Sequence, residues 1–264
     1  MILLLLSAIA IGFVLGLTGS GGGMFAVPAL VASLGWSMQQ AVPVALIAVA
    51  FGSAVAVVDG FRHKLVRYRA AILMACAGLP FTALGMWLAG RLSQRWLTGL
   101  FILVMLYVAV NLLRQARRDA LPNTLMLGRI NTETGRFHWT WLMALSFSAI
   151  GALAGFLAGL LGIGGGFVVV PMLKRFTNVS IQSAVATSLL MIVLIATGGV
   201  ANALLRGVTL PLRETLLFTA ATGTGIVIAR TIAGRITARQ IFLGFASLLF
   251  IVALAMLGKL LLYM

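Results

Sequence analysis

Long uncharged runs separated by short polar intervals are the dominant pattern along this chain. A bilayer core about 30 Å thick needs about 20 apolar residues per helix, and eight runs approach or exceed that length. They cover residues 1–17, 41–58, 70–89, 96–113, 139–161, 184–205, 215–233 and 241–262. The pattern predicts an all-α, polytopic membrane protein with about eight full spans.

Two further apolar stretches, at residues 24–34 and 167–173, are too short to cross a bilayer alone. Each follows a glycine cluster, so we expect two short half-helices that resume after a break in the backbone. The only long polar interval covers residues 114–138 and divides the chain near its middle. We therefore expect a first transmembrane repeat at 1–113, a cytoplasmic linker at 114–138 and a second repeat at 139–264.

The two halves are related in sequence. Residues 12–30 align without gaps on residues 155–173 at an offset of 143, and eleven of the nineteen positions are identical. The same offset pairs Asp59 with Asn202, and an offset of 144 pairs Gly90 and Arg91 with Gly234 and Arg235. Transporter folds are commonly built from such duplicated halves.

Basic residues indicate how the halves are oriented. If the short stretches are return passes, each half has five passes and the halves are inverted, with fourteen Lys and Arg inside and five outside. If they are not, the halves are parallel and the better division is twelve inside against seven outside. The positive-inside rule favours inverted repeats with both termini outside.

Composition excludes several classes of function. The chain is 62% hydrophobic, with nineteen Lys and Arg, four Asp and Glu and a net charge of +15. The basic residues lie between apolar runs, which favours lipid head groups over nucleic acid as their partners. His63 and His138 are isolated, so the sequence predicts no metal site, no cofactor and no enzyme activity.

A helix that breaks inside the membrane exposes backbone groups that must line a cavity or be buried in protein. Consecutive glycines leave their N–H groups uncovered, and the resumed half-helix presents its positive end there. Two such breaks facing each other would give an anion site without a buried Lys or Arg. Packing alone is the competing interpretation, and it is favoured for Gly12, Gly16, Gly155 and Gly159. The residues expected to line the site are Gly19, Ser20, Gly21, Gly22, Gly23, Gly162, Gly164, Gly165 and Gly166.

The paired Gly-x-Gly-Gly-Gly motifs followed by Val-Pro-x-Leu, and the segment Gln-Ser-Ala-Val-Ala-Thr-Ser at 182–188, resemble the TauE/SafE family of sulfite exporters. The resemblance implies a permease of the bacterial inner membrane that exports sulfite or a small organosulfonate. It places the substrate region on the glycine clusters and on Thr187 and Ser188. The first half departs from this pattern, because Val44 and Ala45 stand where the second half has Thr187 and Ser188.

Other polar residues have structural alternatives. The hydroxyls of Thr187 and Ser188 could equally bond back to their own helix. Gln39 and Gln182 precede a span in both repeats, where capping is as good an interpretation as substrate binding. Asp59 is the only acid near the body of a span, and we expect it to pair with Arg62 or Lys64 rather than to serve as a coupling site.

The sequence therefore predicts a permease that moves a small anion across the lipid bilayer by alternating access. An anion channel and a structural or assembly protein of the membrane are the alternatives.

Overall fold

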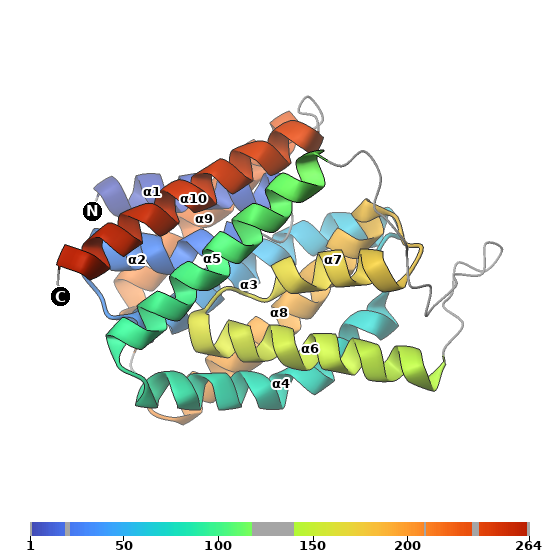
Figure 1. The fold of residues 1–264 in the computed structure, drawn as a ribbon, viewed down its shortest axis with the longest axis horizontal. Coiled ribbons are helices and arrows are strands. Elements are labelled where there is room, and N and C mark those ends of the chain that lie inside the picture. Colours follow the sequence, from blue (N-terminus) through green and yellow to red (C-terminus); the bar gives the residue numbers. More distant parts are fainter. Residues whose placement is uncertain (1, 19–21, 118–139, 209, 234–237, 263–264) are drawn as a thin grey trace.

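The computed structural model describes residues 2–18, 22–117, 140–208, 210–233 and 238–262, and these residues form helices and no strand. The first half contains five α-helices and one short 3-10 helix, η1, and the second half contains five α-helices (Figure 1). In chain order they are α1 (Ile2–Thr18), η1 (Gly22–Phe25), α2 (Ala26–Leu34), α3 (Met38–Arg62), α4 (Tyr68–Arg91), α5 (Gln94–Arg117), α6 (Trp141–Leu161), α7 (Gly166–Phe176), α8 (Ile181–Leu205), α9 (Leu212–Ala233) and α10 (Ala238–Leu262).

Six of the described helices are long and apolar enough to cross a membrane. They are α3, α4, α5, α6, α8 and α10. The eight full spans expected from the sequence also included α1 and α9, and these two do not meet that standard. The described part of α1 has 17 residues. Helix α9 has Arg213 and Glu214 in its first turn and four threonines further on, which lower its mean hydropathy.

The two short segments after the glycine clusters are helical, as expected. Helix α2 has 9 residues and α7 has 11. At a rise of 1.5 Å per residue each is about 15 Å long, which is roughly half the thickness of a bilayer core. The second half-helix extends three residues beyond the predicted 167–173 and includes Lys174 and Arg175 in its last turn.

Each half packs its first helix on the fourth helix of the other half. Helix α1 lies against α9, and α6 lies against α4 (Figure 1). Helix α3 packs on α8 and α5 packs on α10, so equivalent helices of the two halves also contact each other. Neither half has a closed core of its own, and the chain folds as one interleaved bundle.

Glycines allow the two exchanged pairs to approach closely. A Cβ atom on Gly12 would collide with the carbonyl of Thr222, and one on Gly155 would collide with the carbonyl of Gly78. Gly78 and Thr222 are equivalent positions of the two halves, since they are 144 residues apart. The contact of α1 with α9 is therefore repeated between α6 and α4. Gly16 and Gly159 make equally close contacts with α9 and α4, so the packing interpretation of these four glycines is confirmed.

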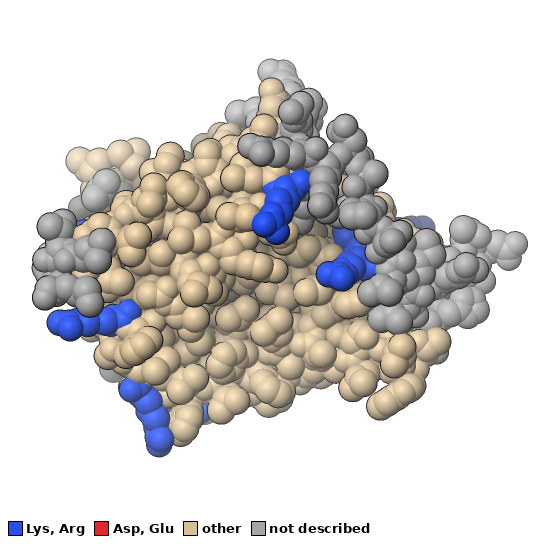
Figure 2. Space-filling model, viewed as in Figure 1, with Lys and Arg blue, Asp and Glu red and all other residues tan. Residues whose placement is uncertain are grey.

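The start of α1 and the end of α10 lie at one end of the bundle, whereas α5 ends and α6 begins at the opposite end (Figure 1). The sides of the bundle are apolar, with Leu103, Leu145 and Leu254 among many exposed hydrophobic residues. Figure 2 shows one broad, mostly uncharged face on which the Lys and Arg side chains are few and lie apart from one another. Trp96 and Trp141, near the starts of α5 and α6, are exposed, as expected for an aromatic belt.

Candidate functional site

The first glycine segment is described from Gly22 onward, where η1 begins. The predicted site residues Gly19, Ser20 and Gly21 lie outside the described residues. Gly22 and Gly23 are buried, and a Cβ on Gly22 would collide with the backbone of Leu15 in α1. The chain therefore folds back directly onto the helix that it has just left.

The second glycine segment is described completely. Helix α6 ends at Leu161, and Gly162 follows in the left-handed region with φ of 73°. Gly164 and Gly165 also have positive φ values, of 78° and 71°, before α7 begins at Gly166. Residues with a Cβ atom are strained in this region, so the sharp reversal from α6 into α7 requires glycine at these positions.

The structure brings the two glycine segments together. A Cβ on Gly23 would lie 3.0 Å from the carbonyl oxygen of Ile163, in the middle of the second segment. Val49 of α3 lies between them, because its two methyl groups would be 2.9 Å from a Cβ on Gly23 and 3.0 Å from one on Gly164. The described parts of the two glycine segments therefore lie close together, with Val49 as their shared neighbour.

The described glycines are close-packed in this conformation. Gly162 lies against Val27 and Val42, and Gly165 lies against the backbone of Ala154. Every described residue of the two segments, including Ile163, is buried. An ion could reach these backbone groups only after the surrounding helices separate.

Helix starts in the described structure differ in their capping, and α4, which follows Arg67, also lacks a side-chain cap. Ser37, Thr140 and Ser180 cap α3, α6 and α8 by accepting hydrogen bonds from backbone N–H groups. The residues before α2 and α7, Phe25 and Gly165, provide no side-chain cap. The first turn of α7 therefore has N–H donors that no side chain caps, close to the point where the two glycine segments meet.

Thr187 and Ser188 are buried in α8, and both hydroxyls bond back to their own helix. Ser188 donates to the carbonyl of Val185 at 2.8 Å. Thr187 donates to the carbonyl of Ser183 at 2.7 Å and accepts from the backbone N–H of Arg67 at 3.0 Å. In this conformation Thr187 holds the loop between α3 and α4 against α8.

Gln39 and Gln182 lie away from the glycine segments. Both are exposed in the first turns of α3 and α8. The amide of Gln39 donates to the carbonyls of Ala89 and Leu92 at 3.4 and 3.3 Å, so it caps the end of α4. Val49 is ten residues further along α3, which is about 15 Å at the rise of an α-helix. Gln39 therefore caps the preceding helix α4, whereas Ser37 caps α3, the span that Gln39 precedes.

The residues that are buried as a whole in the described structure are polar only through hydroxyl groups, although the Nε of Arg67 and the Oδ1 of Asn202 are also buried atoms. The buried polar residues are serines and threonines, and no Lys, Arg, Asp or Glu is among them. Asp59 is exposed at the end of α3 and lies 3.5 Å from the imidazole of His63. The expected ion pair of Asp59 with Arg62 or Lys64 is wrong, because the described residues show Asp59 beside His63, four residues later, and in no ion pair with Arg62 or Lys64.

Sequence reasoning missed one buried polar residue, Ser53 in α3. Its side chain is fully buried, and its hydroxyl has no hydrogen-bond partner. It lies one helical turn from Val49 and therefore on the same face of α3. The only signal in the sequence was a single serine in the middle of the apolar run 41–58.

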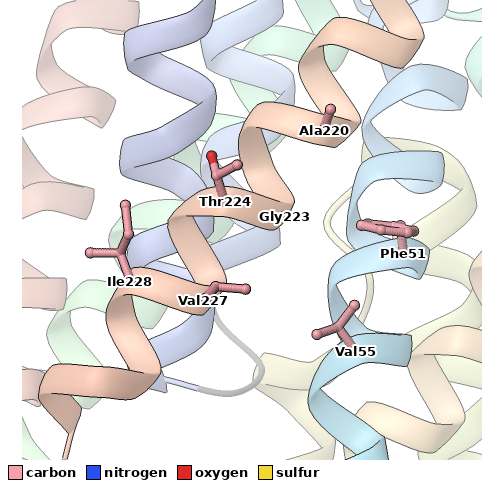
Figure 3. A pocket seen from close by; sticks show the side chains of 7 residues that line it. All are labelled: Phe51, Val55, Ala220, Gly223, Thr224, Val227 and Ile228. Atoms are coloured by element: carbon pink, nitrogen blue, oxygen red, sulfur yellow. The ribbon is translucent and has the colours of Figure 1, made fainter.

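An apolar groove lies between α3 and α9, with a volume of about 430 Å³ (Figure 3). Phe51, Val55 and Val227 help to line it, and Thr224 carries the only side-chain hydroxyl of its lining. That hydroxyl donates to the carbonyl of Ala221 at 2.7 Å. The groove thus offers little to an anion and does not extend the candidate site.

Comparison with known proteins agrees with the motifs. A family model described as sulfite exporter TauE/SafE matches residues 4–256. Two Xylella fastidiosa proteins, each named a probable membrane transporter protein, are 29% and 30% identical to this chain over 184 residues. That match covers 69% of this chain and 66% of each Xylella protein, which is just under two thirds of their length. The probable membrane transporter protein YunE of Bacillus subtilis is 27% identical over 216 residues, or 78% of both chains. No solved structure matches the chain.

Proposed function

We propose that this chain, which belongs to the TauE/SafE family of membrane transporters, carries a small oxyanion across the bacterial inner membrane by alternating access. One observation carries the proposal. The glycine segments of both halves converge in the buried interior, where the half-helix α7 begins without a side-chain cap. Backbone N–H groups at the start of a helix favour negative charge and bind oxyanions in many proteins.

Sulfite or a small organosulfonate is the substrate class that we propose. The family description names sulfite, and such ions present several oxygens to backbone donors. The described residues of the two glycine segments carry no charged side chain. The cost of removing an ion from water rises with the square of its charge, so a neutral site favours a singly charged anion over a doubly charged one.

The proposed transport cycle follows from the helix pairs. Contacts through glycine make α1 with α9, and α4 with α6, tightly packed pairs. We propose that each pair moves as a rigid unit and that the units rock about the contact between α3 and α8. The close-packed glycine segments correspond to an occluded state, which opens to one side of the membrane at a time.

Inverted halves are part of this proposal. The start of α1 and the end of α10 lie at one end of the bundle and the two helices that flank the linker meet its other end, as five passes per half require (Figure 1). With the linker in the cytoplasm, the basic residues of the α3–α4 loop and of the last turn of α7 are also cytoplasmic. Both termini are then outside.

Export needs no coupling acid in this scheme. The membrane potential favours the exit of an anion by about 2.3 kcal/mol per charge per 100 mV. Asp59 is exposed beside His63 at the end of α3, where it serves the surface rather than the site. The proposal is therefore a uniporter driven by the anion gradient and the membrane potential.

Counterflow in proteoliposomes tests this function. Vesicles loaded with unlabelled sulfite or methanesulfonate should accumulate the labelled anion transiently, which a carrier does and a channel does not. Gly165→Leu, which places a large side chain on a left-handed, buried residue, should abolish the signal. Gly90→Leu is the matched control, because a Cβ at Gly90 has no neighbour within 4 Å.

Two results would contradict the proposal. Flux without counterflow would establish the channel alternative. No flux of any small oxyanion through folded wild-type protein would reject transport of this substrate class.

A further inference from the structure

We propose that the hydroxyl of Ser53 is the substrate-binding group of the first half and donates a hydrogen bond to the transported oxyanion. This inference rests on the proposed function. The second half has two hydroxyls, on Thr187 and Ser188, at positions where the first half has Val44 and Ala45. Ser53 gives the first half a hydroxyl of its own, two helical turns further along.

The bonding of Ser53 differs from that of other serines in the helices. A serine within a helix commonly donates to the carbonyl three or four residues earlier. Five serines of the described helices do so, with oxygen–oxygen distances between 2.6 and 3.0 Å. They are Ser7, Ser33, Ser146, Ser188 and Ser247. Ser53 has no partner although its side chain is completely buried.

A buried hydroxyl without a partner is unfavourable and needs an explanation. Ser53 lies on the face of α3 that carries Val49, the residue in contact with both glycine segments. One turn further on, Ala56 belongs to a buried cluster with Ala186 and Leu189 of α8. Ser53 thus lies between the glycine segments and the part of α8 that carries Thr187 and Ser188.

The position is specific to one half of the repeat. At the offset of 143, Ser53 corresponds to Ala196, which is also fully buried. Packing at this depth is therefore satisfied by alanine, and the hydroxyl of Ser53 is not required to fill space. An anion held by backbone N–H groups of the glycine segments would supply the acceptor that the hydroxyl lacks.

Ser53→Ala tests the proposal against a purely structural role. Binding is followed as the stabilisation of detergent-purified protein against heating with increasing methanesulfonate or sulfite, and transport as counterflow. We expect the half-maximal concentration to rise at least fivefold in both assays. The melting temperature without anion should stay the same or rise, because the variant removes an unpartnered buried hydroxyl.

Ser146→Ala is the matched control, since the hydroxyl of Ser146 already donates to Leu142 at 2.8 Å. It should leave both half-maximal concentrations unchanged. If Ser53→Ala binds and transports like the wild type, the role of Ser53 is overturned while the proposed function stands. If the wild type itself neither binds nor transports these anions, the proposed function has failed, and the role of Ser53 fails with it.

Discussion

The hydroxyl of Thr187 accepts a hydrogen bond from the backbone N–H of Arg67, 120 residues earlier in the chain, at a distance of 3.0 Å. One turn away, the hydroxyl of Ser183 donates to the carbonyl of Leu65 at 2.6 Å. Together these bonds hold the loop between α3 and α4 against α8. The sequence offset places Gln40 and Val44 at the equivalent positions of the first half, so the equivalent side chains there include no hydroxyl.

Thr187→Val should loosen this loop. The N–H of Arg67 loses this acceptor, and a lost hydrogen bond of this kind costs about 1–2 kcal/mol. The measurement is the rate at which a thiol reagent labels Val66→Cys, in a background where Cys76 is replaced by serine. We expect labelling to become several times faster, and Thr187→Ser should restore the slow rate.

Ser183→Ala distinguishes a role of Thr187 in holding the loop from a role in binding the substrate. It removes the bond to Leu65 and leaves Thr187 in place, so it should also speed the labelling of residue 66. If Thr187→Val impairs anion binding and Ser183→Ala does not, Thr187 contacts the substrate, as the sequence predicted. Unchanged labelling in both variants would contradict the loop-holding role.

Gly12→Ala should destabilise the protein strongly. The added methyl group would collide with the carbonyl of Thr222, and overpacking of this kind costs about 1–3 kcal/mol or more. Heating followed by gel filtration in detergent measures the loss. Gly99→Ala is the control, because no heavy atom lies within 4 Å of the added Cβ, and it should be neutral or stabilising. Equal stability of the two variants would show that α1 and α9 are not in contact.

Val49→Ala should restore more of the melting stability lost in Gly23→Ala than of the stability lost in Gly164→Ala. The Cβ of each alanine would lie 2.9 or 3.0 Å from a methyl group of Val49, and shortening Val49 removes that overlap. Gly164 also has φ of 78°, where alanine is strained by about 1 kcal/mol whatever its neighbour. Double-mutant cycles on melting stability measure the coupling. No coupling in either pair would mean that Val49 does not join the two glycine segments.

Charge should govern substrate choice. We expect methanesulfonate, with one negative charge, to compete for transport roughly ten times better than sulfate, with two, because the described residues of the glycine segments carry no charged side chain. Competition against labelled sulfite in proteoliposomes measures the ratio. Preference for sulfate would indicate that a cation accompanies the anion into the site.

Thiol labelling from one side of the membrane tests the inverted arrangement. Ser93→Cys lies in the α4–α5 loop and Asn178→Cys lies in the α7–α8 loop, and both positions are exposed. Inverted halves place these residues on opposite sides of the membrane, with residue 93 outside. Parallel halves place them on the same side, so equal labelling by an impermeant reagent would contradict the proposal.

Local sequence patterns predicted most of the helices. Glycine clusters fixed where the spans break, because positive φ values such as that of Gly164 are open to few other residues. Spacing of small residues predicted packing roles for Gly12 and Gly155, and the structure shows a close helix contact at each. Which helix lies opposite each glycine was not predictable, because that depends on the exchange of helices between the halves.

Features that depend on tertiary contacts were missed. The sequence locates the helix break at residues 162–166 but does not reveal that Val27, Val42 and Val49 pack against it. The partner of Asp59 was misjudged because charge was weighed above helical position, and His63 has the better position. Ser53 gave no pattern at all, since a missing hydrogen-bond partner is a property of the folded chain.

The exchange of first helices has a consequence for how this protein is made. Helix α1 is synthesised well before its partner α9, which begins at Leu212. During translation α1 must therefore wait in the lipid, or against a temporary neighbour, with its glycine face unmatched.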